Sequence, residues 1–206
     1  MTSSGIRIVV INGSARSNNY TSMASTLVVD ELKKDAQVSV EVVNPGELNL
    51  PLPGADPNSP ATRRLQEQVR AATGVVLATP EYHGSISSVI KLVIENLGFP
   101  SVLNGKPIAL LGVAAGSIGA IKSLEQLRSI CAHVGGIVLP LPVSVPNVQK
   151  VFDAQGRPLD PNVDKLIRTV ATNLMSYLHH AVCPAVTLER LMRQGIAVAA
   201  GGTHAQ

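Results

Sequence analysis

The sequence has 206 residues, of which 45% are hydrophobic and 15% charged, and its net charge is +3. This length suits one α/β domain with a buried sheet and is short for two domains. Basic and acidic residues are interspersed, and three Tyr, two Phe and no Trp offer few platforms for stacking bases. The composition therefore argues against a nucleic-acid-binding module.

Targeting and redox signals are weak. Residues Met1–Gly5 show no basic segment followed by an apolar run, and no later apolar run is long enough to span a bilayer without Gly, Pro or charge. A cytoplasmic location with no membrane span is therefore expected. Cys131 and Cys183 have no neighbouring His or Cys at metal-ligand spacing, so we interpret them as reduced, structural thiols and expect no metal site.

Five apolar, β-branched runs alternate with five helical patterns along the chain. The first, third and fourth runs are nearly continuous in apolar residues, as in parallel strands that are covered on both faces. This alternation predicts an α/β fold with a doubly wound, five-stranded parallel sheet in the order 2-1-3-4-5, and a ligand at the carboxyl ends of the strands. The predicted strands are Ile6–Ile11, Val38–Val43, Gly74–Thr79, Pro107–Ala114 and Gly136–Val143, and the predicted helices are Thr21–Lys34, Ala61–Ala72, Ile86–Asn96, Ile118–Val134 and Val163–Leu178.

Two segments depart from this alternation. The connection Asn44–Pro60 is too rich in proline for regular structure, and we interpret it as a mobile wall or an interface element. Residues 1–180 are expected to form one domain and residues 181–206 a C-terminal extension. The extension is expected to hold a short helix around Leu188–Gln194 and to end in a disordered tail, Ala197–Gln206.

The first candidate site follows the first strand, in the stretch Asn12–Ser22, which is rich in hydroxyls and amides and contains no carboxylate. Gly13 permits a sharp turn, Arg16 offers a charge-assisted fork, and the next helix presents free N–H groups. These groups are those that a phosphate requires. The alternative is an ordinary helix cap, which needs only one or two such residues.

The second and third candidate segments follow the third and fourth strands. In Thr79–Ser85, Pro80 is expected to end the strand, Gly84 to allow close backbone approach, and Ser85 to cap the next helix. The loop Ala114–Gly119 leaves room for a ring edge, and it is neither a Rossmann fingerprint nor a P-loop. Its helix is expected to face the core with Ile118, Ile121, Leu124 and Cys131. The alternative for the first of these segments is a plain strand-to-helix turn, with Glu81 solvated and His83 on the surface. The alternative for the second is a tight loop needed for helix-to-sheet packing.

These motifs resemble those of the NADPH-dependent FMN reductases, a family that includes related quinone, chromate and azo-dye reductases on a flavodoxin-like fold. The family's Gly-Ser-x-Arg loop corresponds to Gly13–Arg16, its Pro-Glu-Tyr-Asn-Gly-Ser motif to Pro80–Ser85, and its small-residue loop to Ala114–Gly119. The match extends to about residue 180. One departure is His83, which stands where the family usually has Asn and, unlike Asn, can titrate near neutrality. Another is Lys91–Glu95, which replaces a more usual Lys-Asn-Ala-Ile-Asp.

The resemblance assigns roles to individual residues. It implies that the phosphate of FMN is held by Ser14, Arg16, Asn18 or Tyr20, and Thr21. It implies that the isoalloxazine ring is surrounded by Pro80, Glu81, Tyr82, His83 and Gly84 and by Ala115, Gly116 and Ser117. It also implies a homodimer or homotetramer, for which we expect Val89, Val93, Leu97 and Phe99 to pack against a partner subunit.

The implied activity is that of an oxidoreductase. NAD(P)H would reduce bound FMN, which would pass two electrons to a small acceptor such as a quinone, free flavin, metal ion or azo compound, and the flavin would carry the chemistry without a catalytic side chain. The alternative is a flavodoxin-type electron carrier that does not itself oxidise nicotinamide. The basic, aromatic-poor composition favours the enzyme, because such carriers generally use an acidic surface and flank the ring with large aromatics. A flavin-free interaction protein is a third possibility.

Overall fold

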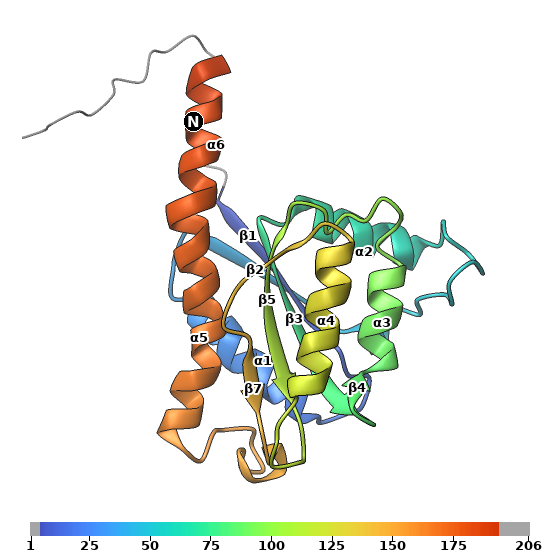
Figure 1. Cartoon of the computed structure of the whole chain (residues 1–206), viewed down its shortest axis with the longest axis vertical. Helices are drawn as coiled ribbons and strands as arrows, with labels where there is room; N and C mark the ends of the chain where they lie inside the picture. Colours follow the sequence, from blue (N-terminus) through green and yellow to red (C-terminus); the bar gives the residue numbers. More distant parts are fainter. Residues whose placement is uncertain (1–4, 194–206) are drawn as a thin grey trace, which may run out of the picture.

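A computed structural model describes residues 5–193 of the chain. Its central sheet runs in the order β2-β1-β3-β5-β6, with parallel pairing between neighbours. Two short strands lie off this path, with β4 antiparallel to β3 and β7 parallel to β5 (Figure 1). The doubly wound α/β prediction is confirmed. The strands are β1 Ile6–Asn12, β2 Val38–Val43, β3 Gly74–Tyr82, β4 Ser85–Ile86, β5 Pro107–Val113, β6 Ile137–Val138 and β7 Val143–Val145.

Helices cover both faces of the sheet. One hydrophobic cluster joins the sheet to α1 and α5, and a second joins it to α2, α3 and α4. Figure 1 shows these two groups on opposite sides of the strands. The helices are α1 Tyr20–Leu32, α2 Pro60–Ala71, α3 Ser88–Glu95, α4 Ile121–His133, α5 Pro161–Tyr177 and α6 Cys183–Arg193, with short 3-10 turns at Pro45–Glu47 and Val148–Lys150.

Strand β1 illustrates why the central runs are apolar throughout. Successive side chains of a strand point to opposite faces, so a strand between two helical layers buries all of them. Ile8 and Val10 lie in the cluster with α1 and α5, whereas Val9 and Ile11 lie in the cluster with α2, α3 and α4. The two-sided core therefore fixes the position of the loop that follows β1.

Two strand predictions are wrong in detail. Strand β3 does not end at Thr79 but continues to Tyr82, and Pro80 pairs with Val113 of β5. The expected strand Gly136–Val143 is broken into β6 and β7, so the sheet has seven strands among the described residues. Pro140 and Pro142 lie at the break and cannot donate to a ladder, and Leu141 between them has φ of 61°.

Several helix details also differ from expectation. Ser85 belongs to β4, and it is Ser87 that caps α3, where its Oγ accepts a hydrogen bond from the N–H of Ile90 at 3.1 Å. Ile118 and Ile121 do not face the core, since they are 76% and 47% exposed. They lie at or before the first turn of α4, and the helix buries its later apolar residues instead.

Of the four expected interface residues, Val89 is half-buried and the other three split into two groups. Val93 and Leu97 are fully buried within their own subunit, so they cannot pack against a partner, whereas Phe99 is 97% exposed. Residues Val93 and Leu97 belong to the cluster beneath α2, α3 and α4. The apolar residues of this segment therefore belong mostly to the core.

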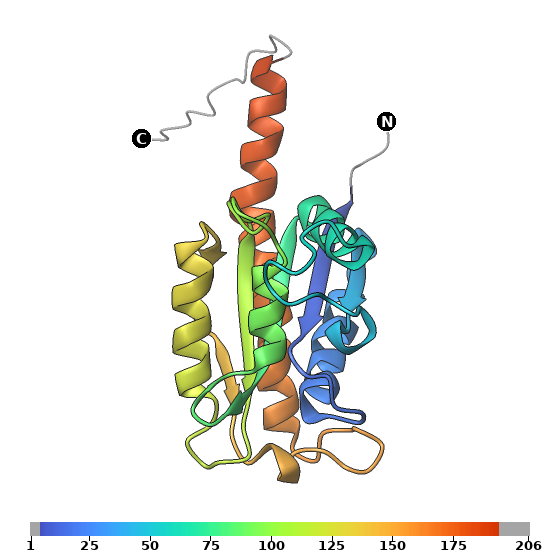
Figure 2. The ribbon, with the colours of Figure 1, turned by 90° about the vertical axis from the view of Figure 1, so that its right-hand side faces the viewer.

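The C-terminal part of the described chain is one long helical rod. Helix α5 runs into a π-helical turn, Leu178–Val182, and then into α6, which projects beyond the body of the molecule (Figure 2). Pro184 explains the π turn, because proline has no N–H to donate to the carbonyl four residues earlier and its ring clashes there. The expected tail Ala197–Gln206 lies outside the described residues. No helix within residues 5–193 is long and apolar enough to cross a membrane.

Candidate functional site

The three segments singled out in the sequence meet at the carboxyl ends of β1, β3 and β5. They enclose a cavity of about 280 Å³, here called the strand-end cavity. Eight predicted site residues line it: Arg16, Asn18, Tyr20, Thr21, Pro80, Glu81, Tyr82 and Ala115. Its other lining residues are Ser17, Asn19, Val113, Ala114 and Val148. Segments far apart in the sequence thus form a single concave site.

The remaining predicted residues lie close by but do not line this cavity. Ser14 lines a second cavity on the other side of the same loop. His83 and Gly84 form the tip of the hairpin between β3 and β4, and Gly116 and Ser117 lie exposed in the loop before α4. These four residues were expected to surround the ring, but they do not form part of the cavity walls.

Gly13 fixes the course of the loop after β1 by close approach rather than by an unusual backbone angle. A Cβ at this position would lie 2.5 Å from the carbonyl oxygen of Ala78 and 3.2 Å from Cβ of Ile90. The Gly13 N–H donates to that Ala78 oxygen at 2.6 Å, and Ser87 Oγ donates to the Gly13 carbonyl at 2.5 Å. The loop is therefore anchored to β3 and to the start of α3.

Beyond Gly13 the loop presents unused donors. Asn18 has φ of 49°, a left-handed conformation that Asn tolerates and that makes the backbone concave. The backbone N–H groups of Ser17 and Asn18 donate to no other group of residues 5–193. The helix dipole of α1 adds positive potential at the same place. These features suit an anion.

Asn19 holds this concave loop against the helix that follows. Its Oδ1 accepts a hydrogen bond from the Ser22 N–H at 2.8 Å, and its Nδ2 donates to the Arg16 carbonyl at 2.7 Å. One side chain thereby caps α1 and closes the turn in front of it. The N-cap interpretation of this stretch is thus correct for Asn19, and it leaves Arg16, Ser17 and Asn18 available.

Aromatic rings flank the cavity at two points. The guanidinium of Arg16 lies over the ring of Tyr82, with Cζ 4.7 Å from the ring centroid. Tyr20 stacks on Phe152, with ring centroids 6.4 Å apart and 17° between the planes. The cation–π contact links the loop after β1 to the end of β3 and holds the charge of Arg16 on the side of the strand-end cavity.

The hairpin tip explains the unusual His83. His83 and Gly84 have φ of 52° and 69°, and they connect Tyr82 to Ser85, which pair across the hairpin. A two-residue hairpin with two positive φ angles strongly prefers Asn followed by Gly, and His is also enriched in the left-handed region. His83 therefore adopts the positive φ angle that this turn position needs, and its side chain is exposed.

The loop after β5 is held by residues that sequence motifs did not identify. The Ala114 N–H donates to the Val145 carbonyl and the Val148 N–H donates to the Ala114 carbonyl, both at 3.0 Å. Gln149 Nε2 donates to the Ala115 carbonyl at 3.2 Å. Gly119 permits this packing, because a Cβ there would lie 2.4 Å from Ser144 Oγ. The loop is a fixed wall of the cavity.

Val148 is a lining residue that lies outside the three segments singled out in the sequence and outside the strands that precede them. It is buried and begins a 3-10 turn directly after Asn147, whose φ is 47°. The dipeptide Pro146–Asn147 is a turn signal that marks a change of direction here. Nothing in that signal says that the turn lies against the loop after β5.

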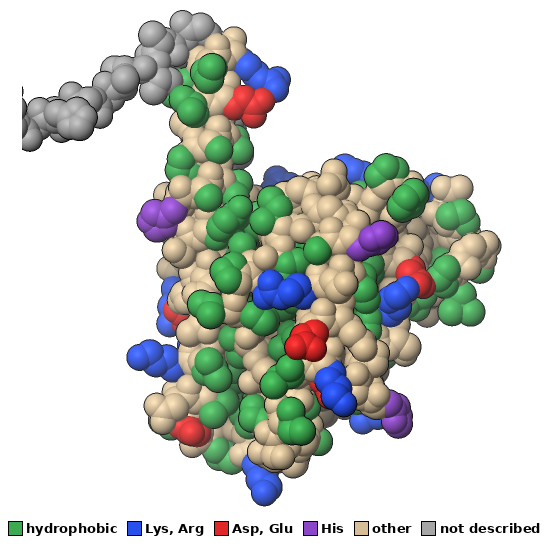
Figure 3. All heavy atoms as spheres, in the orientation of Figure 1, with side chains coloured by type: hydrophobic (Ala, Val, Ile, Leu, Met, Phe, Trp, Pro, Cys, Tyr) green, Lys and Arg blue, Asp and Glu red, His purple; other side chains and the backbone are tan. Residues whose placement is uncertain are grey.

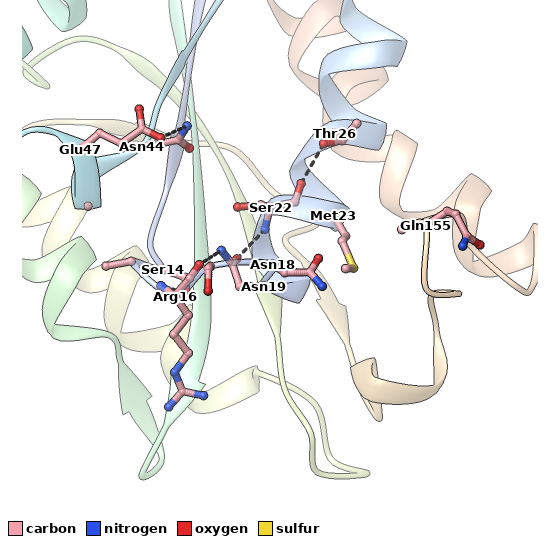
Figure 4. Close-up of a pocket in the computed structure, with 14 residues that line it drawn as sticks. Ser14, Arg16, Asn18, Asn19, Ser22, Met23, Thr26, Asn44, Glu47 and Gln155 are labelled. Atoms are coloured by element: carbon pink, nitrogen blue, oxygen red, sulfur yellow. Dashed lines mark hydrogen bonds between the residues drawn. The ribbon is translucent and has the colours of Figure 1, made fainter.

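A larger cavity of about 480 Å³ lies on the other side of the loop after β1. Asn44 and Glu47 lie on one side of it and Gln155 on the other, with polar side chains of the loop and α1, including Asn18, Asn19 and Ser22, between them (Figure 4). Arg16 points away from these residues (Figure 4). The two cavities share the loop residues Arg16, Ser17, Asn18 and Asn19.

Known proteins resemble the chain in sequence. Residues 6–150 match the family model of NADPH-dependent FMN reductases. An NAD(P)H-dependent FMN reductase of Pseudomonas aeruginosa is 32% identical over 81% of this chain and 91% of its own length. An NADPH azoreductase of Bacillus sp. is 29% identical over 84% of this chain and 93% of its own, and a quinone reductase of Escherichia coli is 34% identical over 66% and 75%.

Solved structures resemble it in fold. A flavoenzyme NAD(P)H:(acceptor) oxidoreductase of Paracoccus denitrificans superposes with a TM-score of 0.70 at 22% identity, over 84% of this chain and 97% of that one. A flavodoxin from the domain Archaea gives a TM-score of 0.55 at 11% identity, over 82% and 99%. The chain is flavodoxin-like in fold and belongs to the family of NADPH-dependent FMN reductases, which confirms the expectation of an FMN-dependent oxidoreductase that uses NAD(P)H.

Proposed function

We propose that the strand-end cavity and the loop after β1 together hold FMN, with the phosphate at residues 14–21 and the ring beside Tyr82 and Ala115. The observation that carries this proposal is the single cavity in which the ends of β1, β3 and β5 meet. It lies at the point where the sheet order reverses direction, which is where doubly wound sheets bind ligands.

The chemistry of the lining supports this assignment. The free N–H groups of Ser17 and Asn18, the start of α1 and the guanidinium of Arg16 all favour a phosphate. Glu81 is the one carboxylate of the strand-end cavity, and its Oε2 accepts a hydrogen bond from the Ser123 N–H at 3.1 Å. That contact directs its charge toward the positive end of α4, so the residues present fit the cofactor.

Bound here, FMN would supply the hydride chemistry that links NAD(P)H to a small acceptor. The chain's own residues bind and orient. The hairpin pairing of Tyr82 with Ser85 and the Ala114–Val148 hydrogen bond fix two walls of the cavity in place. Quinones and azo compounds are the proposed acceptors, because relatives carry the names quinone reductase and azoreductase.

We also propose that the protein forms an even-numbered homo-oligomer and is located in the cytoplasm. An even-numbered homo-oligomer is supported by the exposed apolar side chains Phe99, Leu52 and Leu141, which are 97%, 72% and 74% exposed. A cytoplasmic location would supply the NAD(P)H that the reaction consumes.

The test begins with the absorption spectrum of the purified protein and a titration of the flavin-free protein with FMN and riboflavin. We expect tight binding of FMN and weaker binding of riboflavin, which lacks the phosphate, together with NADH or NADPH oxidation that depends on an added quinone. Equal affinity for FMN and riboflavin would remove the phosphate from the loop after β1. Flavin binding without nicotinamide oxidation would favour the electron-carrier alternative.

A further inference from the structure

Helix α6 has apolar side chains with no partner in the described structure. The last side chains of the helical rod that pack against the core are Val182 and Cys183. Beyond them Val186, Leu188 and Met192 are 57%, 44% and 68% exposed. Figure 2 shows the helix standing clear of the body. The apolar side of a surface helix normally packs against another element, so α6 needs a packing surface.

The apolar residues of the rod are spaced for such a surface. Ala181, Ala185, Leu188 and Met192 recur at intervals of four, three and four residues, which places them along one side of a helix. The charged residues Glu189 and Arg193 pair with each other. Helix α6 therefore carries an apolar stripe fit to contact another helix.

An open apolar groove lies at the base of the same rod. The groove has a volume of about 330 Å³ and is lined by Leu139, Pro140, Leu141, Asn173, Ser176, Tyr177, His180 and Ala181. Strand β6 next to it is the last strand of the main sheet path, and Ile137 and Leu141 are 42% and 74% exposed. Hydrophobic side chains gather on this face between the rod and α4 (Figure 3). An exposed strand edge of this kind is normally covered.

We propose that the occupant is a second copy of this chain, with the two α6 helices packed antiparallel across a two-fold axis so that each helix ends in the other copy's groove. The lengths match. In a pair centred between Val186 and Thr187 the stripe maps onto itself, with Met192 opposite the partner's Ala181 and Leu188 opposite the partner's Ala185. Met192 thereby reaches the wall of the partner's groove.

The symmetry of this arrangement is self-consistent. The groove wall at His180 and Ala181 leads directly into α6, so one two-fold axis covers both stripes and both grooves and leaves no open end to propagate. The surface differs from the α3 segment, whose Val93 and Leu97 are buried in their own subunit.

Sedimentation velocity of the full-length protein at micromolar concentration tests the proposal. The variants Leu141→Asp and Met192→Asp each place a carboxylate in the contact, and each is expected to weaken assembly at least tenfold. Leu159→Asp is the matched control, because Leu159 is 63% exposed and lies outside the groove and α6. Retained flavin binding shows that the variants fold. A monomeric wild type, or assembly unchanged by both variants, would overturn the proposal.

Cross-linking identifies the contact itself. In a Cys183→Ser background, a chain carrying Leu141→Cys is mixed with a differently tagged chain carrying Met192→Cys and oxidised with copper phenanthroline. We expect a disulfide between the two tagged chains. A further chain carries both Leu141→Cys and Met192→Cys. A disulfide that forms only within this chain, and not between chains, would show that α6 folds onto its own groove. That result, or no disulfide in the mixture, contradicts the exchange between copies.

Discussion

Glu81 and Ser123 are joined by a hydrogen bond in which the backbone N–H of Ser123 donates to Glu81 Oε2 at 3.1 Å. Glu81 lies near the end of β3 and Ser123 in the first turn of α4. Ala120, at the N-cap position of α4, makes no side-chain hydrogen bond to the helix. The carboxylate of a distant strand therefore supplies the cap that the local sequence lacks.

Removing this cap should destabilise the protein. Glu81→Ala is expected to lower the free energy of unfolding by about 0.5–2 kcal/mol, as for a lost helix cap, and Glu81→Gln by less because it keeps an acceptor. Urea unfolding measures the difference. Glu125→Ala, at an exposed position of the same helix, is the control. Equal stability of the Glu81→Ala variant and the control would contradict the capping role.

Arg16 should contribute to FMN binding through the phosphate. Arg16→Ala is expected to weaken FMN binding by one to two powers of ten, because a hydrogen bond to a charged group is worth about 1.5–3 kcal/mol. Fluorescence titration measures the affinity, with the exposed Arg7 as the control position for the same substitution. Riboflavin should respond much less. An equal loss for both flavins would mean that Arg16 acts through Tyr82 and not through the phosphate.

The hairpin tip should tolerate Asn but not a β-branched residue. His83 has φ of 52°, so His83→Asn is expected to leave stability unchanged or slightly raised, whereas His83→Val should cost about 1–2 kcal/mol. Thermal unfolding of the flavin-free protein compares the two variants. If His83→Val were as stable as the wild type, the hairpin would not hold the backbone angle described.

Gly13 is required by close packing. Gly13→Ala brings a Cβ to 2.5 Å from the Ala78 carbonyl oxygen, so the loop must shift, at a cost of about 1–3 kcal/mol. Gly116→Ala is the matched control, because nothing lies within 4 Å of a Cβ at that position. We expect FMN affinity to fall in the first variant as the loop moves. Unaltered stability and affinity in Gly13→Ala would show that the loop accommodates the methyl group.

The two thiols should react differently. Burial raises the pKa of Cys131 to about 12 from an ordinary value of 9.0, whereas Cys183 is only half-buried. At pH 8, iodoacetamide should therefore modify Cys183 first and Cys131 only after unfolding. The unfolded thiol ionises at lower pH than the folded one, so this contribution to stability is complete below about pH 9 and is lost as the pH rises toward 12. Rapid labelling of Cys131 in the folded protein would contradict its burial.

Local patterns were enough to predict much of the fold. The continuous apolar run Ile6–Ile11 indicated a strand between two layers, because both faces must be covered. Local reasoning failed where neighbours decide the outcome. Pro80 continues its strand and pairs with Val113, beyond Ala78 where the pairing with β1 ends, and Pro140 and Pro142 lie where the last expected strand is divided in two.

The sequence by itself determined the chemistry of the site: a carboxylate-free loop after the first strand, a small-residue loop after the fourth, and family motifs at both. These are local properties, because composition and spacing remain visible in the linear chain. Only the tertiary structure decided which groups meet. It brought Val148 to the cavity, directed Glu81 to Ser123 and placed Arg16 over Tyr82, because the twist and order of a sheet bring distant residues together and no local pattern encodes those distances.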